Sequence, residues 1–130
     1  MENFKTSVDE NDIVHIALTG SLKKENLPGL KEWADETAII VRNTHEKTGQ
    51  KVKALIDLTN LKVDYDPQDL MIIVNLMKTN EPHMFKAGTF GAAIGIRFAA
   101  DVALTMAGRT NLKSFKTKEE ALVWLSSSAE

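Results

Sequence analysis

The chain has 130 residues, 43% hydrophobic and 26% charged, which predicts one folded domain over residues 1–130 and excludes a disordered or low-complexity chain. Sixteen basic and 18 acidic residues give a net charge of −2, so no excess of positive charge points to nucleic acid or an anionic membrane. Because the chain has no cysteine, disulfides, thiolate metal sites and cysteine nucleophiles are excluded.

The first third of the chain is predicted to form a hairpin followed by a long helix. Apolar and polar residues alternate over 4–8 and again over 13–18, with turn residues between them, and Gly20 is predicted to end the second strand. Residues 27–47 carry an apolar stripe at three- and four-residue spacing, which predicts an amphipathic helix. The stripe consists of Leu30, Trp33, Ala34, Thr37, Ile40, Val41 and Thr44.

The middle of the chain is predicted to form a buried strand and a second helix. Residues 52–58 are nearly all apolar, which is typical of a central strand that is covered on both faces. A helix is predicted over 66–78, with Asp66 as its N-cap and Pro67 at its first position.

The last third is predicted to contain a strand over 87–94, a helix over 96–107, a strand over 112–115 and a helix over 118–127. Thr117 and Glu120 have the spacing of a capping box, and the apolar side of the last helix consists of Ala121, Leu122, Trp124 and Leu125. Residues 87–106 are long enough to span a bilayer, but they contain Arg97 and Asp101. We therefore expect a buried strand and helix there and no transmembrane segment.

Strands and helices thus alternate along the chain, which predicts an α/β fold with right-handed crossovers between parallel strands. The N-terminal hairpin adds one antiparallel pair. We expect a mixed, mainly parallel sheet of four or five strands with about four helices around it.

This order and two local patterns resemble the SpoIIAA-like family of STAS domains, the anti-sigma-factor antagonists. The first pattern is Ala54-Leu55-Ile56-Asp57-Leu58-Thr59-Asn60-Leu61, which is similar to the family's central strand and the loop after it. The second runs from Phe115 to Leu125 and is similar to the closing strand and helix. The resemblance implies a bacterial, cytoplasmic, regulatory protein-interaction domain that is not an enzyme, needs no cofactor, and binds a kinase-like or sigma-pathway regulator.

The chain departs from this family where the second helix begins. Signalling members of the family carry an Asp-Ser-Ser-Gly-like segment there, in which a partner kinase phosphorylates a serine. This chain reads Val63-Asp64-Tyr65-Asp66-Pro67-Gln68 and has no serine or threonine between positions 61 and 78. Asp66 falls on one of the two serine positions, so a fixed negative charge at a helix N-terminus replaces the phosphorylatable group.

Other kinds of chemistry have weaker support in the sequence. The glycine-rich residues 88–95 lack nucleotide-binding spacing, which favours close backbone packing at the end of a strand. His15, His45 and His83 lie too far apart for a local metal motif. Four carboxylates, those of Asp57, Asp64, Asp66 and Asp69, gather where ligands bind in parallel sheets, but helix capping and solvation are the simpler explanation.

An apolar run over 70–74 leaves Met71 and Ile72 half exposed on the second helix, which indicates a surface for a partner or for a homodimer. We therefore predict a non-catalytic interaction domain. Its partner-binding residues are Thr59, Asn60, Asp64, Tyr65, Asp66, Met71 and Ile72. Two alternatives stay open: a binding protein for a small apolar or lipid-like ligand, and a metal-dependent enzyme that uses the clustered aspartates.

Overall fold

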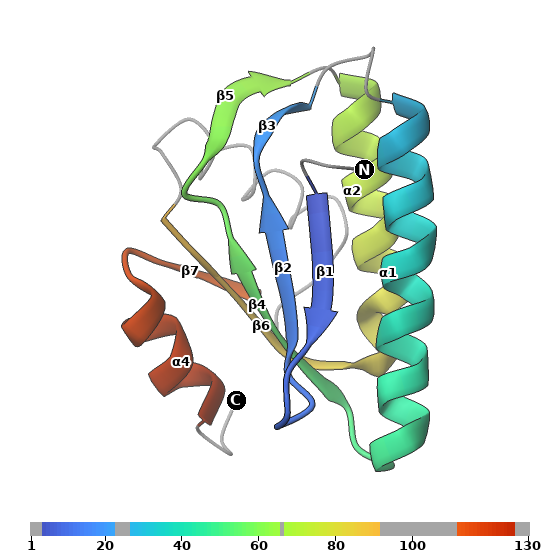
Figure 1. Cartoon of the computed structure of the whole chain (residues 1–130), viewed down its shortest axis with the longest axis vertical. Helices are drawn as coiled ribbons and strands as arrows, with labels where there is room; N and C mark the ends of the chain where they lie inside the picture. Colours follow the sequence, from blue (N-terminus) through green and yellow to red (C-terminus); the bar gives the residue numbers. More distant parts are fainter. Residues whose placement is uncertain (1–3, 23–26, 66, 92–111, 127–130) are drawn as a thin grey trace.

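Five strands form the main sheet of the computed structural model, which describes residues 4–22, 27–65, 67–91 and 112–126 (Figure 1). β1 pairs antiparallel with β2, and the other three pairings are parallel, which confirms the mixed, mainly parallel sheet. In spatial order the strands are β1 (Phe4–Val8), β2 (Val14–Leu18), β4 (Val52–Asp57), β6 (Met84–Phe90) and β7 (Leu112–Phe115).

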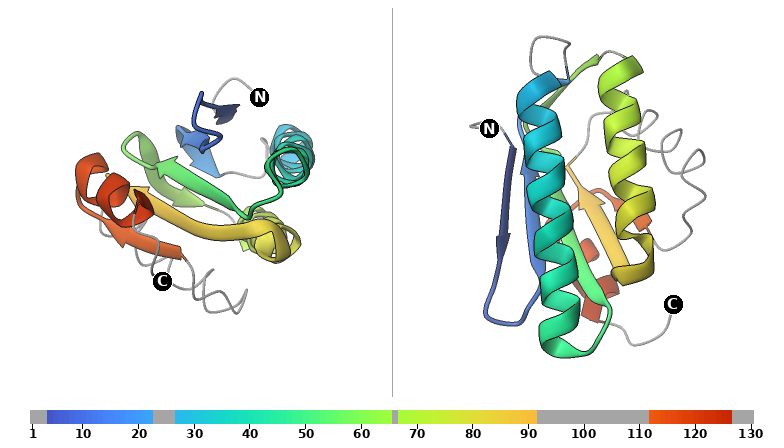
Figure 2. Two further views of the ribbon diagram at one scale, coloured as in Figure 1. Left: turned by 90° about the horizontal axis from the view of Figure 1, so that it is seen from below. Right: turned by 90° about the vertical axis from the view of Figure 1, so that its right-hand side faces the viewer.

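Helices cover both faces of this sheet. α1 (Leu27–Thr48) and α2 (Pro67–Asn80) lie side by side on one face and run in the same direction (Figure 2). The 3-10 turn η2 (Glu81–His83) follows α2, and α4 (Lys118–Ser126) packs on the opposite face against β4, β6 and β7. The described residues hold three α-helices, where we expected four; the helix predicted over 96–107 lies outside the described residues.

The apolar stripe of α1 faces the core as its spacing predicts. Leu30, Trp33, Thr37 and Val41 are buried, and the Trp33 indole donates to Thr6 Oγ1 over 2.8 Å. The helix ends before Gly49, which takes the left-handed φ of +70° that favours glycine at a helix C-terminus. The spacing of the stripe and its burial therefore agree from Leu30 to Val41.

β4 lies between β2 and β6 and is covered on both faces, as its apolar composition predicts. Val52 and Ala54 belong to the large core under α1 and α2. Leu55 points the other way into a smaller core with Ala121 and Leu125 of α4. Because successive side chains of a strand alternate between its faces, a strand with helices on both sides needs apolar residues at nearly every position.

Two predictions about loops are wrong. Gly20 does not end a strand but begins β3 (Gly20–Leu22). The stretch between the strand predicted over 52–58 and the helix predicted over 66–78, for which no strand was predicted, contains β5 (Leu61–Tyr65). These two strands pair in parallel as a separate two-stranded sheet. β3 has three residues, too few to show a period of two, whereas Leu61, Val63 and Tyr65 of β5 alternate with Lys62 and Asp64, a strand pattern that our interpretation missed. Each strand is stabilised by a partner about 40 residues away.

The last helix is capped as predicted but exposes more apolar surface than expected. The backbone N–H of Glu120 donates to Thr117 Oγ1 over 3.2 Å, which satisfies one free donor of the first turn. Of the predicted apolar side, Ala121 and Leu125 are buried, whereas Leu122 is 36% exposed. A helix of nine residues that lies over the sheet can bury only a narrow stripe.

Candidate functional site

The turn between β4 and β5 presents two of the predicted site residues to solvent. Thr59 and Asn60 are exposed at its tip. Asp57 Oδ1 accepts the Thr59 N–H over 2.9 Å, and the Leu61 N–H donates to the Leu58 carbonyl over 3.2 Å. Because Leu58 and Leu61 are buried on either side, the exposed tip is held at both ends.

The end of β6 supports this turn from behind. The Phe90 carbonyl accepts the Leu58 N–H over 3.0 Å. Gly91, the next residue, has a φ of +77°, and a Cβ atom built on it would collide with Thr59 Oγ1. The close packing that we predicted for the glycine-rich segment is therefore found at Gly91, where a side chain would displace the turn.

The two predicted residues of α2 differ in exposure. Met71 is 38% exposed, as the apolar run predicts. Ile72 is half buried and packs against the large core, and it also lines a groove between α1 and α2. Val74, within the same run, is completely buried. The second helix thus exposes Met71 to solvent, whereas Ile72 is half buried in the packing of the helix.

Of the remaining predicted residues, two lie at the end of β5 and one lies outside the described residues. Asp64 and Tyr65 form the end of β5, where Tyr65 is in register with Leu22 of β3. Asp66 lies outside the described residues. Of the four clustered carboxylates, Asp57 is the one whose side-chain hydrogen bond is described, and it accepts from the turn.

A hollow of about 280 Å³ opens beside Asp57, on the face of the sheet that α4 partly covers. Its lining combines charged and aromatic side chains from five elements. Asp57 and Phe90 come from β4 and β6, His15 from β2, Lys5 from β1 and Lys118 from α4. The hollow therefore has room for a small polar group in contact with the sheet and with Lys118 of α4.

The carboxylate of Asp9 holds His15 at the edge of this hollow. Asp9 Oδ2 lies 2.7 Å from His15 Nε2, and Asp9 Oδ1 accepts the backbone N–H groups of Asn11 and Ile13. Burial opposes ionisation of Asp9, but these hydrogen bonds and the His15 ring outweigh it, so the pKa of Asp9 is lowered. The hairpin loop is thereby tied to β2.

Two features of the structure had no signal in the sequence. His45 of α1 and His83 of η2 lie with their Nδ1 atoms 2.8 Å apart, although they are 38 positions apart in the chain. Lys86 in β6 is only 1% exposed, and its Nζ donates to the Trp124 carbonyl over 3.1 Å. Neither spacing nor composition could have predicted these contacts, since both depend on how helices pack on the sheet.

No group of three or more histidine, aspartate or glutamate side chains that could hold a metal ion occurs in the described part of the chain. Within the same residues, no helix is long and apolar enough to cross a membrane.

Comparison with solved structures identifies the fold. A protein of the DUF3478 family with a SpoIIAA-like fold, from Shewanella loihica PV-4, has a TM-score of 0.60 and 19% identity over 94% of this chain and 91% of its own. The anti-sigma factor antagonist SpoIIAA in its unphosphorylated form has a TM-score of 0.60 and 13% identity over 94% of this chain and 96% of its own.

The Bacillus cell fate determinant SpoIIAA in its phosphorylated form is similar as well, with a TM-score of 0.58 and 13% identity over 94% of this chain and 98% of its own. No family profile matches the sequence, and no curated protein matches it. At these identities the likeness concerns the fold, and it shows that the chain has a SpoIIAA-like α/β fold.

Proposed function

We propose that this chain is a non-catalytic regulatory domain that binds a protein partner through one surface. This surface, the turn surface, consists of the β4–β5 turn, the end of β5 and the beginning of α2. Its residues are Thr59, Asn60, Asp64, Tyr65, Asp66, Met71 and Ile72. The fold supports the proposal, because the same fold occurs in an anti-sigma factor antagonist.

The observation that carries the proposal is the braced and exposed β4–β5 turn. Thr59 and Asn60 are exposed, while hydrogen bonds from Leu58 and Leu61 and the packing of Gly91 hold the backbone beneath them. An exposed segment that is already ordered loses little conformational entropy when a partner binds. Presentation of Thr59 and Asn60 on an already ordered turn therefore favours binding of a partner protein.

Met71 supplies the apolar part of the turn surface. Its side chain is 38% exposed on α2, and methionine adapts its shape readily to a partner. Asp66 directly precedes Pro67, the first residue of α2, in the sequence, and a helix N-terminus favours negative charge. We propose that Asp66 supplies a permanent negative charge to the partner contact. We infer that the partner contacts one apolar side chain and one fixed charge, with no switch by serine phosphorylation between positions 61 and 78.

The first experiment isolates a partner from the native host and then measures its affinity for purified variants. Met71→Lys places a charge in the apolar contact, so we expect affinity to fall at least about tenfold. Ile39→Lys is the matched control, because Ile39 is a 47% exposed apolar residue of α1 that does not belong to the turn surface. Equal affinity of the Met71→Lys variant and the parent chain would reject the proposal.

The second experiment separates the charge of Asp66 from its capping role. Serine caps a helix about as well as aspartate, so Asp66→Ser is expected to keep its stability within about 0.5 kcal/mol, whereas Asp66→Ala is expected to lose about 1 kcal/mol. If the charge is recognised, Asp66→Ser folds normally but binds the partner differently. Unchanged binding would remove Asp66 from the turn surface. Sedimentation of the parent chain and of the Met71→Lys variant shows whether the partner is a second copy of the chain, since the parent chain would then dimerise more strongly than the variant.

A further inference from the structure

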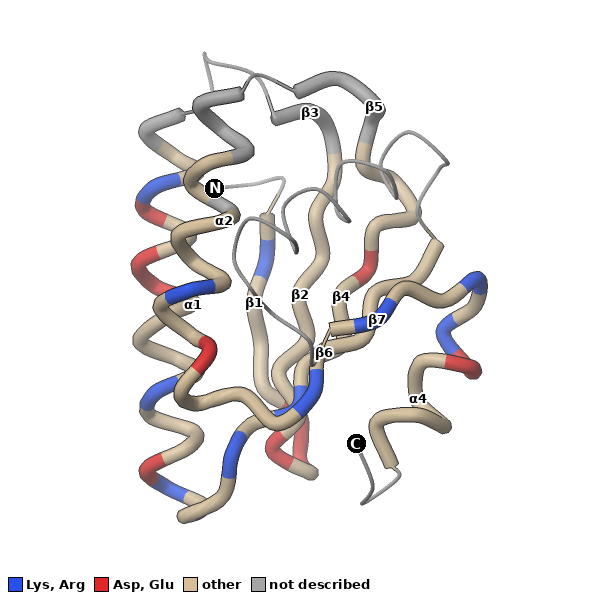
Figure 3. The backbone as a smooth tube through the Cα atoms, turned by 180° about the vertical axis from the view of Figure 1, so that it is seen from behind, with Lys and Arg blue, Asp and Glu red and all other residues tan. Residues whose placement is uncertain are grey.

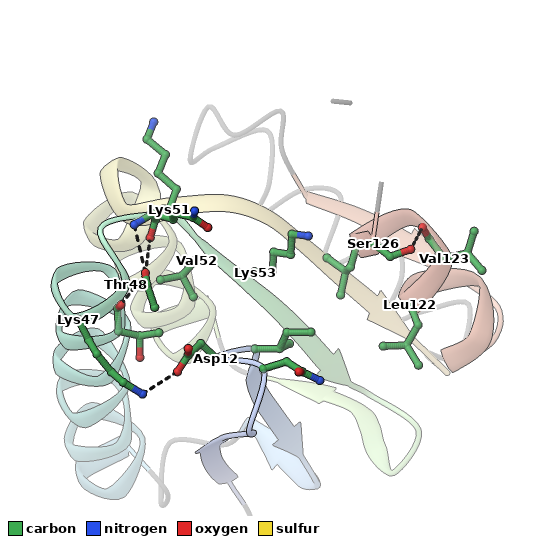
Figure 4. A pocket seen from close by; sticks show the side chains of 14 residues that line it. Asp12, Lys47, Thr48, Lys51, Val52, Lys53, Leu122, Val123 and Ser126 are labelled. Carbon is green, nitrogen blue, oxygen red and sulfur yellow. Dashed lines mark hydrogen bonds and ion pairs between the residues drawn. The ribbon is translucent and has the colours of Figure 1, made fainter. Parts of the chain in front are cut away.

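A second surface lies at the other end of β4. An open groove of about 930 Å³ runs between the end of α1 and the side of α4 (Figure 4). The beginning of β4 forms its floor, and the hairpin turn after β1 closes one side. Five residue steps of β4, from Val52 to Asp57, place the groove about 17 Å from the β4–β5 turn, so the two surfaces are separate.

The wall formed by α4 is apolar and uncovered. Val123 is 72% exposed and Leu122 is 36% exposed, and both line the groove (Figure 4). Val52 and Leu125 continue the apolar surface at the floor, where they are buried. Exposed valine and leucine side chains at successive positions of a short helix are a contact surface that water solvates poorly.

The end of α1 and the beginning of β4 contribute basic residues to the groove. Lys47, Lys51 and Lys53 line the groove together with one acidic residue, Asp12 (Figure 4). Figure 3 shows the basic positions where the chain passes from α1 into β4. Lys47 Nζ lies 2.9 Å from Asp12 Oδ1, so these two charges compensate each other. Neither Lys51 nor Lys53 has a carboxylate partner among the described residues, which leaves the groove positive on a chain of net charge −2.

The openness of the groove decides which kind of occupant fits. Sites for small molecules bury roughly 70–90% of the ligand's surface. The side chain of Lys47 is 73% exposed and that of Val123 nearly as much, so the walls do not enclose a small molecule. A polypeptide segment can bind in such an open groove, because its own backbone and side chains cover the groove residues that it contacts.

From this combination of charge and apolar surface we propose that the groove, lined by Lys51, Lys53, Leu122 and Val123, docks an acidic segment of a partner protein. Acidic side chains of the segment pair with Lys51 and Lys53, and its apolar side chains lie on Leu122 and Val123. The turn surface plays no part in this contact, so the chain can hold two partners at the two ends of β4.

The test uses a fluorescein-labelled peptide of twelve residues made of glutamate and leucine, and a twin in which lysine replaces every glutamate. Fluorescence anisotropy is expected to show binding of the acidic peptide and affinity at least about tenfold lower for the basic twin. Raising sodium chloride from about 50 to about 500 mM is expected to weaken binding, because salt screens exposed charges.

Two pairs of variants assign the binding to the groove. Lys51→Glu and Val123→Asp change exposed side chains in the groove, and each is expected to lower the affinity at least about tenfold. Lys31→Glu and Ile39→Asp are the matched controls on α1, and both are expected to bind like the parent chain. Lys31 lies about 24 Å along the helix from Lys47, which places it far from the groove. Circular dichroism confirms that all four variants are folded.

Three results would overturn the proposal. The first is failure of the acidic peptide to bind, or equal losses in the groove and control variants. The second is binding of dodecanoate in a manner sensitive to Lys51→Glu without binding of the peptide, which would make the occupant an amphiphilic anion. The third is a dimer of the parent chain that Lys51→Glu dissociates. Met71→Lys is expected to leave peptide binding unchanged, so failure of this proposal and failure of the turn surface are distinguishable.

Discussion

Gly91 and Thr59 are in direct contact at the site where the end of β6 supports the β4–β5 turn. A Cβ atom on Gly91 would collide with Thr59 Oγ1 and lie 3.1 Å from Thr59 Cα. The φ of Gly91, +77°, is also one that other residues adopt at a cost. Two independent reasons therefore require glycine at a position whose neighbour lies in the turn surface.

Gly91→Ala is expected to destabilise the chain by about 3 kcal/mol, because left-handed backbone strain and displacement of the turn add together. Urea unfolding measures this loss. Gly49→Ala is the matched control: Gly49 has a similar φ of +70°, but nothing lies within 4 Å of an added Cβ atom. It is expected to cost about 1 kcal/mol, from backbone strain alone. Equal losses at both positions would show that the contact with Thr59 is unimportant.

The Asp9–His15 contact predicts how stability depends on pH. The folded chain lowers the pKa of Asp9 below its ordinary value of 3.8, so the unfolded chain binds the proton more readily. The stabilisation is complete above pH 3.8 and is lost as the pH falls through the lower pKa of the folded state. Asp9→Asn is therefore expected to be less stable than the parent chain at pH 6, with a difference that shrinks below pH 3.8. Urea midpoints measured across this range test it, and a constant difference would contradict it.

Lys86 is buried and Lys113 is exposed, and the ammonium groups of both lie over the ring of Trp124. Their Nζ atoms lie 4.8 and 5.3 Å from the centre of the Trp124 ring. Lys86→Glu puts a carboxylate against the Trp124 carbonyl in a closed environment and is expected to cost about 3 kcal/mol or more. Lys113→Glu, at an exposed position, is expected to cost less than about 1 kcal/mol. Thermal unfolding of both variants is the measurement, and similar losses would show that burial does not matter here.

The cap of α4 predicts a smaller and more specific effect. Thr117→Ala removes the oxygen that accepts the Glu120 N–H and is expected to lower stability by about 1 kcal/mol. Thr117→Ser keeps the oxygen and is expected to stay within a few tenths of the parent value. Because α4 forms one wall of the basic groove, the alanine variant is also expected to weaken binding of the acidic peptide. Identical stabilities of the two variants would contradict the capping role.

The sequence by itself determined the elements whose local pattern and burial agree. The α1 stripe from Leu30 to Thr44 and the continuous apolar run of β4 both predicted their structures, because a side chain's exposure there follows the period of its own helix or strand. Exposure of Met71 was predictable for the same reason, since a helix cannot bury five apolar residues in a row against one sheet.

Only the tertiary structure decided which distant segments meet. β3, with three residues, carries no periodic signal of its own and is a strand because it pairs with β5. β5 alternates apolar and polar residues, but only the tertiary structure decided that its partner is β3. His45 and His83 come together because α1 packs against η2, and Lys86 is buried because α4 lies across β6. The groove lined by Lys51, Lys53, Leu122 and Val123 likewise combines the beginning of β4 with the end of α1 and the side of α4. Local patterns report the period of one element, whereas these contacts depend on how that element packs against elements from other parts of the chain.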